Sequence, residues 1–321
     1  MYRVVKREGI GNIAVEETSV PTIGPRQILV RPRRTLISRG SEIGRRYVDP
    51  RALDPSIMGY SAAGVVEAVG PDVTDFSVGQ RVAAVAPHAE LVVVDLAIEG
   101  GRRAVPIPDP VSDDAATFQP LATGALMWAK IAGIAPGETV VVLGQGLVGS
   151  LVLQAVRTYQ RGQVIAVDAL ESRCALATRL GANRVINAAK EDPVAAVLDA
   201  TNGTGADVVI DCVGGKAGVQ SFAQALDMCR LMGRIHLIAL YHGEMLPLDS
   251  SKVQRKLIIG GYYTDEPFAP FATGAMAAIA DGSIQVEPLI THHFPFRRAK
   301  EAFDLLYARP GDAVGVILEW E

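Results

Sequence analysis

The residues that could do chemistry gather first in one short polar stretch. The segment "TLISRGSEIGRRYV", Thr35 to Val48, begins like the end of a buried strand and then becomes abruptly polar, with Arg39, Ser41, Glu42, Arg45 and Arg46. Cations and hydroxyls placed together could stabilise charge that develops in a reaction. An ordinary solvated loop has the same composition, so the stretch alone does not decide between the two.

A second candidate is a glycine pattern, Gly144-x-Gly146-x-x-Gly149, within "TVVVLGQGLVGSLVLQAV". By itself the pattern is weak, because the chain contains 32 glycines. Here it follows an apolar strand and opens a helix, which is the context of a dinucleotide-binding loop. Gly144 would permit the tight turn, Gly146 would let the backbone approach a pyrophosphate, and Gly149 would let helix and strand pack closely.

The next strand, "QVIAVD", ends at Asp168, 19 residues after Gly149 (168 − 149). A carboxylate at this place accepts hydrogen bonds from ribose hydroxyls and repels a 2′-phosphate. The sequence therefore predicts that NAD(H) is preferred, with NADP(H) possible because Arg173 could receive that phosphate. Arg173 could equally be a solvated helix charge or a lid over the adenine.

These residues need a scaffold, and residues 112–264 supply a regular alternation of strands and helices. Apolar runs of this length are typical of a parallel sheet covered on both faces. We expect helices at 147–160 and 171–182, and a helical start capped by Ser112. The fold class is therefore α/β, with a doubly wound Rossmann sheet. The six expected strands are "TVVVLG", "QVIAVD", "RVINA", "ADVVIDCVG", "GRIHLIAL" and "KLIIGGYY".

The two ends of the chain have a different pattern of residues. Residues 1–111 read as short strands broken by Gly and Pro, which indicates an irregular barrel or sandwich. Residues 265–321 contain two helical and two strand-like segments. We expect this tail to fold back on the N-terminal part, so that residues 1–111 and 265–321 form one β-rich domain with 112–264 inserted.

Composition narrows the class of partner. The formal net charge is −4 without a basic run, which argues against nucleic-acid binding. The three cysteines have no CxxC spacing and indicate reduced thiols. Since no secretory signal or membrane-length apolar run is visible, we expect a cytoplasmic protein with a small-molecule substrate.

The chain resembles the medium-chain dehydrogenase/reductase superfamily, the zinc alcohol dehydrogenases, over essentially its whole length. The most specific segments are "APGETVVVLGQGLVGSLVLQAV", "VDALESRCALATRLGANRVINA" and "GADVVIDCVGG". The resemblance implies a GroES-like barrel domain beside the Rossmann domain. It also implies cofactor contacts from further residues of the loop and its surroundings, which are Thr123, Gln145, Leu147, Val148 and Val213.

The same resemblance implies that the catalytic zinc is missing. Where zinc-bearing relatives have a Cys, a His and an acid, this chain has Arg39, Tyr60 and Gln119. These are poor or impossible ligands for Zn²⁺. No Cys precedes Cys174, so the four-Cys structural zinc lobe is missing too. We therefore expect a zinc-independent member with no metal site.

Without a metal, side chains must handle the proton and the developing alkoxide. The positions that the resemblance brings to the active site are Arg39, Glu42, Tyr60, His88 and Gln119. Arg39 could lower the phenol pKa of Tyr60, and His88 could relay the proton to solvent. The alternative is that Arg39 forms an ion pair with Glu42 while Tyr60 only packs.

Three functions stay open at this point. The first is an NAD(H)-dependent dehydrogenase of a secondary alcohol such as a sugar, polyol or cyclitol. The second is an enone or quinone double-bond reductase using NAD(P)H, and the third is a non-catalytic nucleotide-binding protein. By resemblance we also expect a homodimer, because "KLIIGGYY" would leave an unprotected sheet edge in a monomer.

Overall fold

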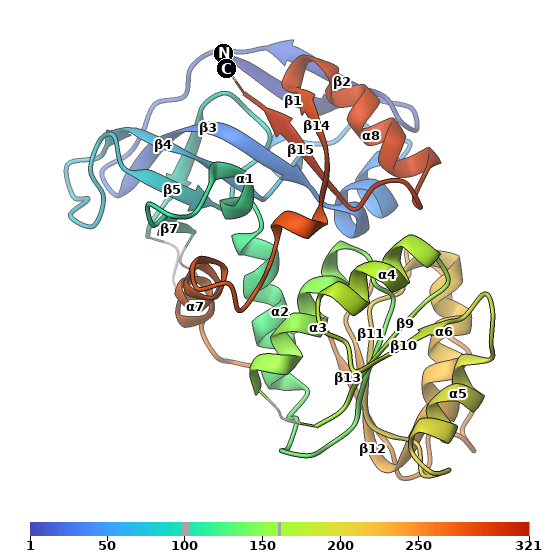
Figure 1. The fold of residues 1–321 in the computed structure, drawn as a ribbon. Helices are drawn as coiled ribbons and strands as arrows, with labels where there is room; N and C mark the ends of the chain where they lie inside the picture. Colours follow the sequence, from blue (N-terminus) through green and yellow to red (C-terminus); the bar gives the residue numbers. More distant parts are fainter. Residues whose placement is uncertain (98–102, 160–161, 321) are drawn as a thin grey trace. The chain divides into compact units, whose positions relative to one another are not determined.

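The computed structural model describes residues 1–97, 103–159 and 162–320 (Figure 1). The chain divides into two compact units. Residues 1–123 and 266–321 form one of them, here called the β-rich unit, and residues 124–265 form the other, the α/β unit. Both ends of the chain thus belong to one unit, and the α/β unit is inserted between them.

The β-rich unit is built on one seven-stranded sheet and a separate two-stranded one. The larger sheet has the order β14-β15-β3-β4-β5-β7, and β6 pairs with β3 off this path. Its strands are β3 (Gln27–Ile37), β4 (Ala62–Val69), β5 (Arg81–Ala84), β6 (Val92–Asp95), β7 (Ala104–Pro106), β14 (Ile290–Pro295) and β15 (Gly315–Glu319). The smaller sheet pairs β1 (Tyr2–Lys6) with β2 (Ile13–Glu17) in antiparallel fashion.

The chain ends meet in this sheet because β15 lies antiparallel to β3, with Leu318 opposite Thr35. One core cluster lies under α8 (Ala299–Ala308) and includes Phe303, Leu306 and Trp320. A second cluster around Val30, Val66 and Val82 fills the space within the strands. Apolar burial on this scale is what fixes the polar loop after β3 in place.

The α/β unit has a six-stranded parallel sheet in the order β10-β9-β8-β11-β12-β13. Its strands are β8 (Val140–Leu143), β9 (Val164–Asp168), β10 (Arg184–Asn187), β11 (Ala206–Asp211), β12 (Cys229–Leu237) and β13 (Leu257–Gly260). This order reverses between β8 and β11, as in the doubly wound dinucleotide-binding fold. The predicted α/β Rossmann class is therefore confirmed.

Helices cover both faces of this sheet (Figure 1). Helices α3 and α4 pack on each other beside β8 and β9, and α5 and α6 pack on each other beside β10 and β11. Their bounds are α3 (Leu147–Tyr159), α4 (Glu171–Arg179), α5 (Pro193–Ala200) and α6 (Gly215–Met228). Gln160, the last residue of the helix expected at 147–160, lies outside the described residues.

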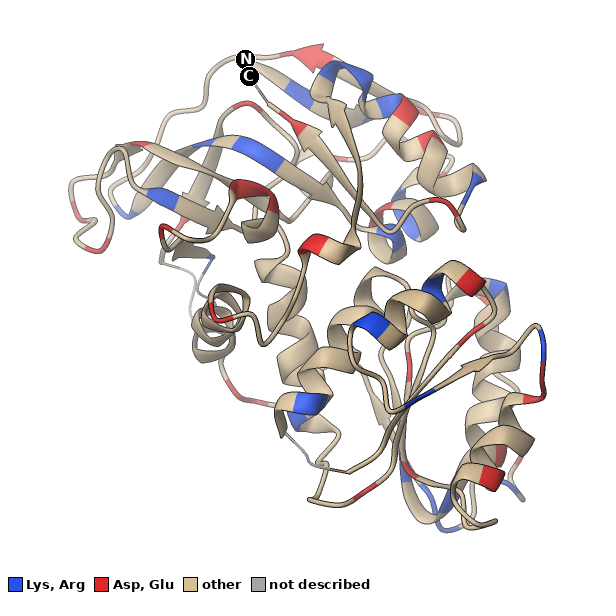
Figure 2. Cartoon of the chain, in the orientation of Figure 1, with Lys and Arg blue, Asp and Glu red and all other residues tan. Residues whose placement is uncertain are grey.

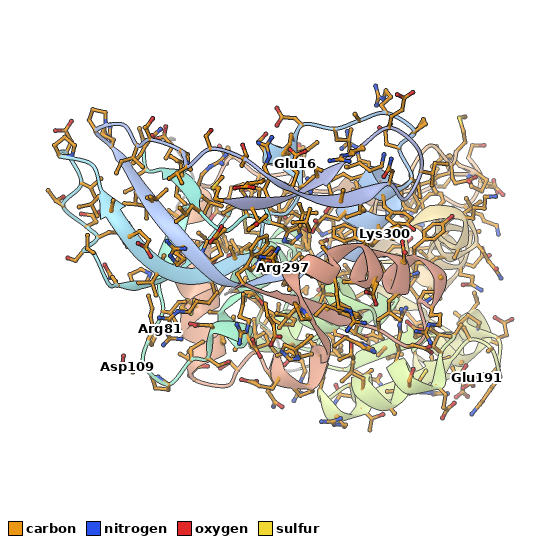
Figure 3. All side chains as sticks on the ribbon, turned by 90° about the horizontal axis from the view of Figure 1, so that it is seen from above. Glu16, Arg81, Asp109, Glu191, Arg297 and Lys300 are labelled. Atoms are coloured by element: carbon orange, nitrogen blue, oxygen red, sulfur yellow. The ribbon has the colours of Figure 1, made fainter. Side chains whose placement is uncertain are left out.

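The boundary between the units lies at Thr123, whereas the sequence placed it at residue 111. The reason is the acidic start of α1 (Asp113–Ala116). Asp113 pairs with Arg81 of β5, labelled in Figure 3, and Asp114 pairs with Arg34 of β3. Figure 2 shows the red turn of α1 beside the blue stretch of β3. These ion pairs hold α1 on the barrel strands, and α2 (Gln119–Ile131) begins in the same unit.

Two remaining elements bear on later arguments. Helix α7 (Phe268–Ala280) belongs to the β-rich unit. Strand β13 has only four residues, so the eight-residue strand predicted from "KLIIGGYY" is wrong in length, because the chain turns at Gly261, whose φ is 49°. Among the described residues no helix is long and apolar enough to cross a membrane.

Candidate active site and nucleotide-binding loop

The polar stretch after β3 forms a π-helix, η1 (Arg39–Tyr47). Such wide helical turns occur often at functional sites. Ser38 stands at its start in extended conformation, with its side chain buried. Ile43 and Tyr47 anchor the helix in the core, and the Tyr47 hydroxyl donates to Asp304 of α8 at 2.8 Å. The polar side chains of η1 are therefore held on a fixed backbone.

Tyr60 and Ser41 are brought together by this helix. The Ser41 hydroxyl lies 3.1 Å from the phenol oxygen of Tyr60 and 3.3 Å from the hydroxyl of Ser38. Burial raises the pKa of the Tyr60 phenol, and the negative charge of Glu42 raises it further. The cation that lowers this pKa is Arg46, not Arg39, and it does not outweigh burial. The expectation that a neighbouring Arg would bring the phenol pKa down was therefore wrong in both respects.

Glu42 and His88 form a fully buried pair. The carboxylate Oε1 of Glu42 lies 2.9 Å from Nε2 of His88, and its Oε2 accepts from the backbone N–H of Ser38 at 2.8 Å. The other ring nitrogen of His88 lies 2.8 Å from the Thr35 hydroxyl, which also accepts from Trp320 Nε1 at 2.9 Å. Both nitrogens of His88 are thus engaged with buried groups, so a relay from His88 to solvent does not fit. The carboxylate of Glu42 is engaged by His88 and by the Ser38 N–H, and its pairing with Arg39 stays a prediction.

Arg39 and Gln119 lie at the starts of two different helices, η1 and α2. Arg39 is the first residue of η1 and is half-buried. Gln119 is buried at the start of α2, where its amide nitrogen donates to Thr123 Oγ1 at 2.9 Å and to the Ala272 carbonyl at 3.0 Å. Thr123, expected among the cofactor contacts, is engaged by this interaction and belongs to the β-rich unit.

The glycine loop of the α/β unit meets each demand that the sequence placed on it. Gly144 has a φ of 82°, which a side chain would strain. A Cβ on Gly149 would lie 1.7 Å from the carbonyl oxygen of Gly144, so only glycine fits there. A Cβ on Gly146 would meet only the tip of Arg173, at 3.8 Å. The backbone at Gly146 is therefore open to a close approach by a phosphate, next to Leu147 and Val148 in the first turn of α3.

Asp168 holds this loop from the end of β9. Its Oδ2 accepts from the Gln145 N–H at 2.7 Å, and its Oδ1 accepts from the Leu170 N–H at 2.9 Å. The Arg173 guanidinium lies 3.7 Å from the same carboxylate. The Oε1 atom of Gln145 is buried and has no hydrogen-bond partner among the described residues. An unsatisfied acceptor beside an open backbone is what a loop made for a polar ligand would show.

A further acid, Asp211, holds the backbone of Val213, which was expected among the cofactor contacts, and was not identified from the sequence. Its buried carboxylate accepts from the Val213 N–H at 3.0 Å, from Ser221 at 2.8 Å and from Tyr241 at 2.9 Å. Burial raises the pKa of Asp211 to about 6. The Val213 side chain lies next to Gly144, so Asp211 fixes the turn that borders the glycine loop.

Comparison with known proteins identifies this arrangement. A family described as "Alcohol dehydrogenase GroES-like domain" matches residues 24–96, and one described as "Zinc-binding dehydrogenase" matches residues 148–279. The chain belongs to the medium-chain dehydrogenase/reductase superfamily. This confirms the resemblance seen in the sequence, the GroES-like nature of the β-rich unit and the assignment as an oxidoreductase that acts on alcohols.

Individual relatives match over nearly the whole chain. L-idonate 5-dehydrogenase of Vitis vinifera is 26% identical, with 96% of this chain and 92% of that protein covered. L-threonine 3-dehydrogenase of Deinococcus deserti is 28% identical, with 100% and 99% covered. Among solved structures, alcohol dehydrogenase TADH from Thermus sp. ATN1 superposes with a TM-score of 0.85 at 24% identity, with 100% of each chain covered.

For a medium-chain dehydrogenase, this donor set does not fit a catalytic zinc. Arg39 cannot bind a metal, Gln119 donates its amide hydrogens inside the fold, and Tyr60 would have to ionise against a raised pKa. In the parts of the chain that the structure describes, no three His, Cys, Asp or Glu residues are grouped so that they could hold a metal.

The sequence reasoning also overlooked two residues of the same loop. The sequence does not distinguish Ser41 from its polar neighbours, although its hydroxyl contacts Tyr60. The Arg46 guanidinium carbon lies 5.8 Å from the centroid of the Tyr60 ring. Only their presence in one polar stretch signalled them, because nothing in the residue pattern indicates a π-helix.

Proposed function

We propose that this protein is an NAD(H)-dependent, zinc-independent dehydrogenase that interconverts a secondary alcohol and a ketone, with a sugar, polyol or cyclitol as the substrate class. The observation that carries the proposal is the Tyr60–Ser41 contact at 3.1 Å. It supplies a phenol and a hydroxyl at the position where zinc-bearing relatives have a metal ligand. The relatives named for L-idonate and for sorbitol support the substrate class.

In this reaction the chain must donate a proton to one substrate oxygen or accept a proton from it. A bound nicotinamide would give or take the hydride. In the reducing direction the neutral Tyr60 phenol donates its proton to the ketone oxygen, and Ser41 donates a hydrogen bond that stabilises the resulting phenolate. In the oxidising direction the phenolate accepts the proton of the alcohol. A partly buried tyrosine with a raised phenol pKa is suited to the first of these roles at neutral pH.

The cofactor preference rests on Asp168. Its carboxylate stands at the end of β9 and is already oriented by two backbone N–H groups. A 2′-phosphate placed there would meet this charge in a nearly buried setting, where charges are poorly screened. Arg173 offsets part of that repulsion, so NADP(H) is expected to bind more weakly and not to be excluded.

A cytoplasmic location is part of the same proposal. All three cysteines are free thiols in the structure, as expected for a reducing compartment.

The proposal is tested by turnover of a panel of polyols, cyclitols and enones with either cofactor, before and after treatment with a chelator. We expect alcohol oxidation with NAD that survives chelation and is reduced by a factor of roughly 10²–10⁴ in Tyr60→Phe, with the dissociation constant of NADH unchanged. Tyr2→Phe, another partly buried tyrosine of the β-rich unit, is the control. Turnover of enones only, or one tightly bound zinc per chain by elemental analysis, would contradict the proposal.

A further inference from the structure

Arg46 carries a buried donor that no other described residue accepts from. Its Nη1 atom is buried and has no hydrogen-bond partner among the described residues. Leaving a buried charged donor unsatisfied is costly, and a bound water, ion or ligand group can satisfy it. Arg46 lies on η1, in the same helix as Ser41, so this unpaired donor is close to the proposed reaction site.

The acids near Arg46 in the chain have other partners. Glu42, the one acid of η1, is turned inward to His88 and to the Ser38 N–H. Asp49, which follows the helix, accepts two hydrogen bonds from the Arg51 guanidinium at 3.0 and 2.8 Å. Neither carboxylate is therefore free to neutralise Arg46.

The distance to Tyr60 limits what could complete the site. The guanidinium carbon of Arg46 lies 5.8 Å from the centroid of the Tyr60 ring. Since the phenol oxygen is the proposed proton donor, an anion held by Arg46 would lie within the length of one small molecule from the reacting oxygen. A substrate could touch both groups at once, with its anion on Arg46 and its hydroxyl or carbonyl on Tyr60.

We propose that the substrate carries an anionic oxygen group, a carboxylate or a phosphate, and that Arg46 binds this group while Tyr60 and Ser41 contact the oxygen of the carbon that is oxidised. This inference rests on the proposed dehydrogenase function and narrows its substrate class to acidic derivatives of polyols or sugars. Arg is suited to this task because its planar guanidinium binds carboxylate and phosphate oxygens through paired hydrogen bonds.

Selectivity between charged and neutral substrates follows from the same cost of leaving a buried donor unpaired. A site built to hydrogen-bond a charged group rejects the neutral analogue, because the analogue leaves the buried donor unpaired. We expect kcat/KM to favour the acid or the phosphate ester over the neutral polyol by roughly 10- to 100-fold, the range that one charge-assisted hydrogen bond supports.

The chain offers a matched control at the adjacent position. Arg45 lies on the same helix and is exposed. Arg45→Gln and Arg46→Gln remove the same charge from the same helix, so only a specific contact distinguishes them. Arg46→Lys keeps the charge and serves as a second test if Arg46→Gln does not fold.

The first experiment measures binding without turnover. Inorganic phosphate and oxalate are titrated calorimetrically, at constant ionic strength, into the free protein and into its NADH complex. We expect both anions to bind the wild type and Arg45→Gln alike, at least tenfold more weakly to Arg46→Gln, and with intermediate affinity to Arg46→Lys. Equal weakening in Arg45→Gln, or no binding of either anion to the wild type at tens of millimolar, would overturn the inference.

The second experiment compares kcat/KM within two matched pairs, L-iditol with L-idonate and galactitol with galactitol 1-phosphate. Arg46→Gln should lose the preference for the charged member of each pair, because its kcat/KM falls more with the charged substrate than with the neutral one. For each pair, the ratio of kcat/KM with the charged substrate to kcat/KM with the neutral one is measured in the wild type. The larger ratio shows whether the site prefers a carboxylate or a phosphate. An equal fall with charged and neutral substrates would overturn the inference, and so would a weakened NADH dissociation constant, which would make Arg46 a cofactor contact.

The two proposals fail separately. If phosphate and oxalate bind through Arg46 but none of the alcohols is oxidised, the dehydrogenase function is wrong and the anion site remains. If neutral polyols are oxidised through Tyr60 without any effect of Arg46, the dehydrogenase function stands and the anion site is wrong.

Discussion

The Oε1 atom of Glu42 lies 2.9 Å from Nε2 of His88, and neither side chain has any exposed surface. This pair joins the start of η1 to the loop before β6, and Thr35 extends it to Trp320 near the C-terminus. Each member is satisfied by another buried member. The network therefore fixes η1 on the strands of the β-rich unit, and we assign its residues to positioning and not to proton transfer.

The first prediction concerns the stability of this network. His88→Ala leaves the Glu42 carboxylate and the Thr35 hydroxyl without one partner each, so the free energy of unfolding should fall by about 2–5 kcal/mol. Glu42→Gln keeps one acceptor for the Ser38 N–H and one donor for the imidazole, and should cost clearly less. Urea denaturation of both variants provides the measurement. Losses of equal size, or a loss below about 1 kcal/mol for His88→Ala, would show that the network does not hold η1.

The glycine loop and the active-site helix were predictable to different degrees, for a physical reason. Gly144, Gly146 and Gly149 lie within six residues, between a strand and a helix, so local geometry fixes their tasks and the sequence reveals them. The contact of Glu42 with His88 spans 46 residues of chain and depends on how two loops pack. The role proposed for Arg46 depends on a π-helix and on the partners of the nearby acids, which only the folded chain reveals.

The second prediction concerns the pH dependence of Tyr60. Burial raises the pKa of the phenol, so the neutral form persists to a higher pH than in a free tyrosine. Ketone reduction, which needs the neutral phenol, should stay constant from pH 6 to 9 as far as this group is concerned. Alcohol oxidation, which needs the phenolate, should rise about tenfold per pH unit at saturating substrate as long as proton transfer limits the rate. Tyr60→Phe should abolish this dependence, whereas a plateau of wild-type oxidation near pH 7 would show another base.

The third prediction uses the buried Asp211. Burial raises its pKa from 3.8 to about 6, so the folded state binds a proton more tightly than the unfolded state. The contribution of this group to stability is therefore fully present below pH 3.8 and is lost as the pH rises through about 6. The shift corresponds to about 3 kcal/mol.

Asp211→Asn tests this contribution, since the amide keeps an acceptor for the Val213 N–H and does not titrate. The difference in unfolding free energy between wild type and variant should move in favour of the variant by up to about 3 kcal/mol from pH 4 to pH 7. Chemical denaturation at four pH values provides the measurement. A difference that stays constant over this range would show that Asp211 ionises as easily in the folded chain as in the unfolded one.

The fourth prediction concerns cofactor choice. NAD(H) should bind at least tenfold more tightly than NADP(H), because the Asp168 carboxylate repels a 2′-phosphate. Asp168→Ser should narrow this gap, and it should also weaken NAD(H) itself, since the carboxylate holds the Gln145 N–H of the glycine loop. Arg173→Gln should widen the gap, because it removes the cation beside the carboxylate. Fluorescence titration of each variant with both cofactors measures these dissociation constants. NADP(H) binding as tightly as NAD(H) in the wild type would refute the assignment of Asp168.

The last prediction is a homodimer formed at the edge of the parallel sheet. Strand β13 is the last strand in the sheet order, so one side of its backbone has no partner strand in the described chain. Large apolar side chains are exposed on it and near it, with Leu257 at 56%, Met232 at 63% and Tyr263 at 80%. An unprotected strand edge beside exposed apolar groups is an association surface, and a two-fold copy of the same edge would cover both.

Light scattering at micromolar concentration should therefore report about twice the chain mass of 34.0 kDa. Leu257→Asp should shift the mass toward the monomer by burying a charge at the interface. Ile10→Asp, at a residue 63% exposed in the β-rich unit, should leave the dimer intact. A wild-type particle of one chain mass, or equal dissociation by both substitutions, would refute this interface.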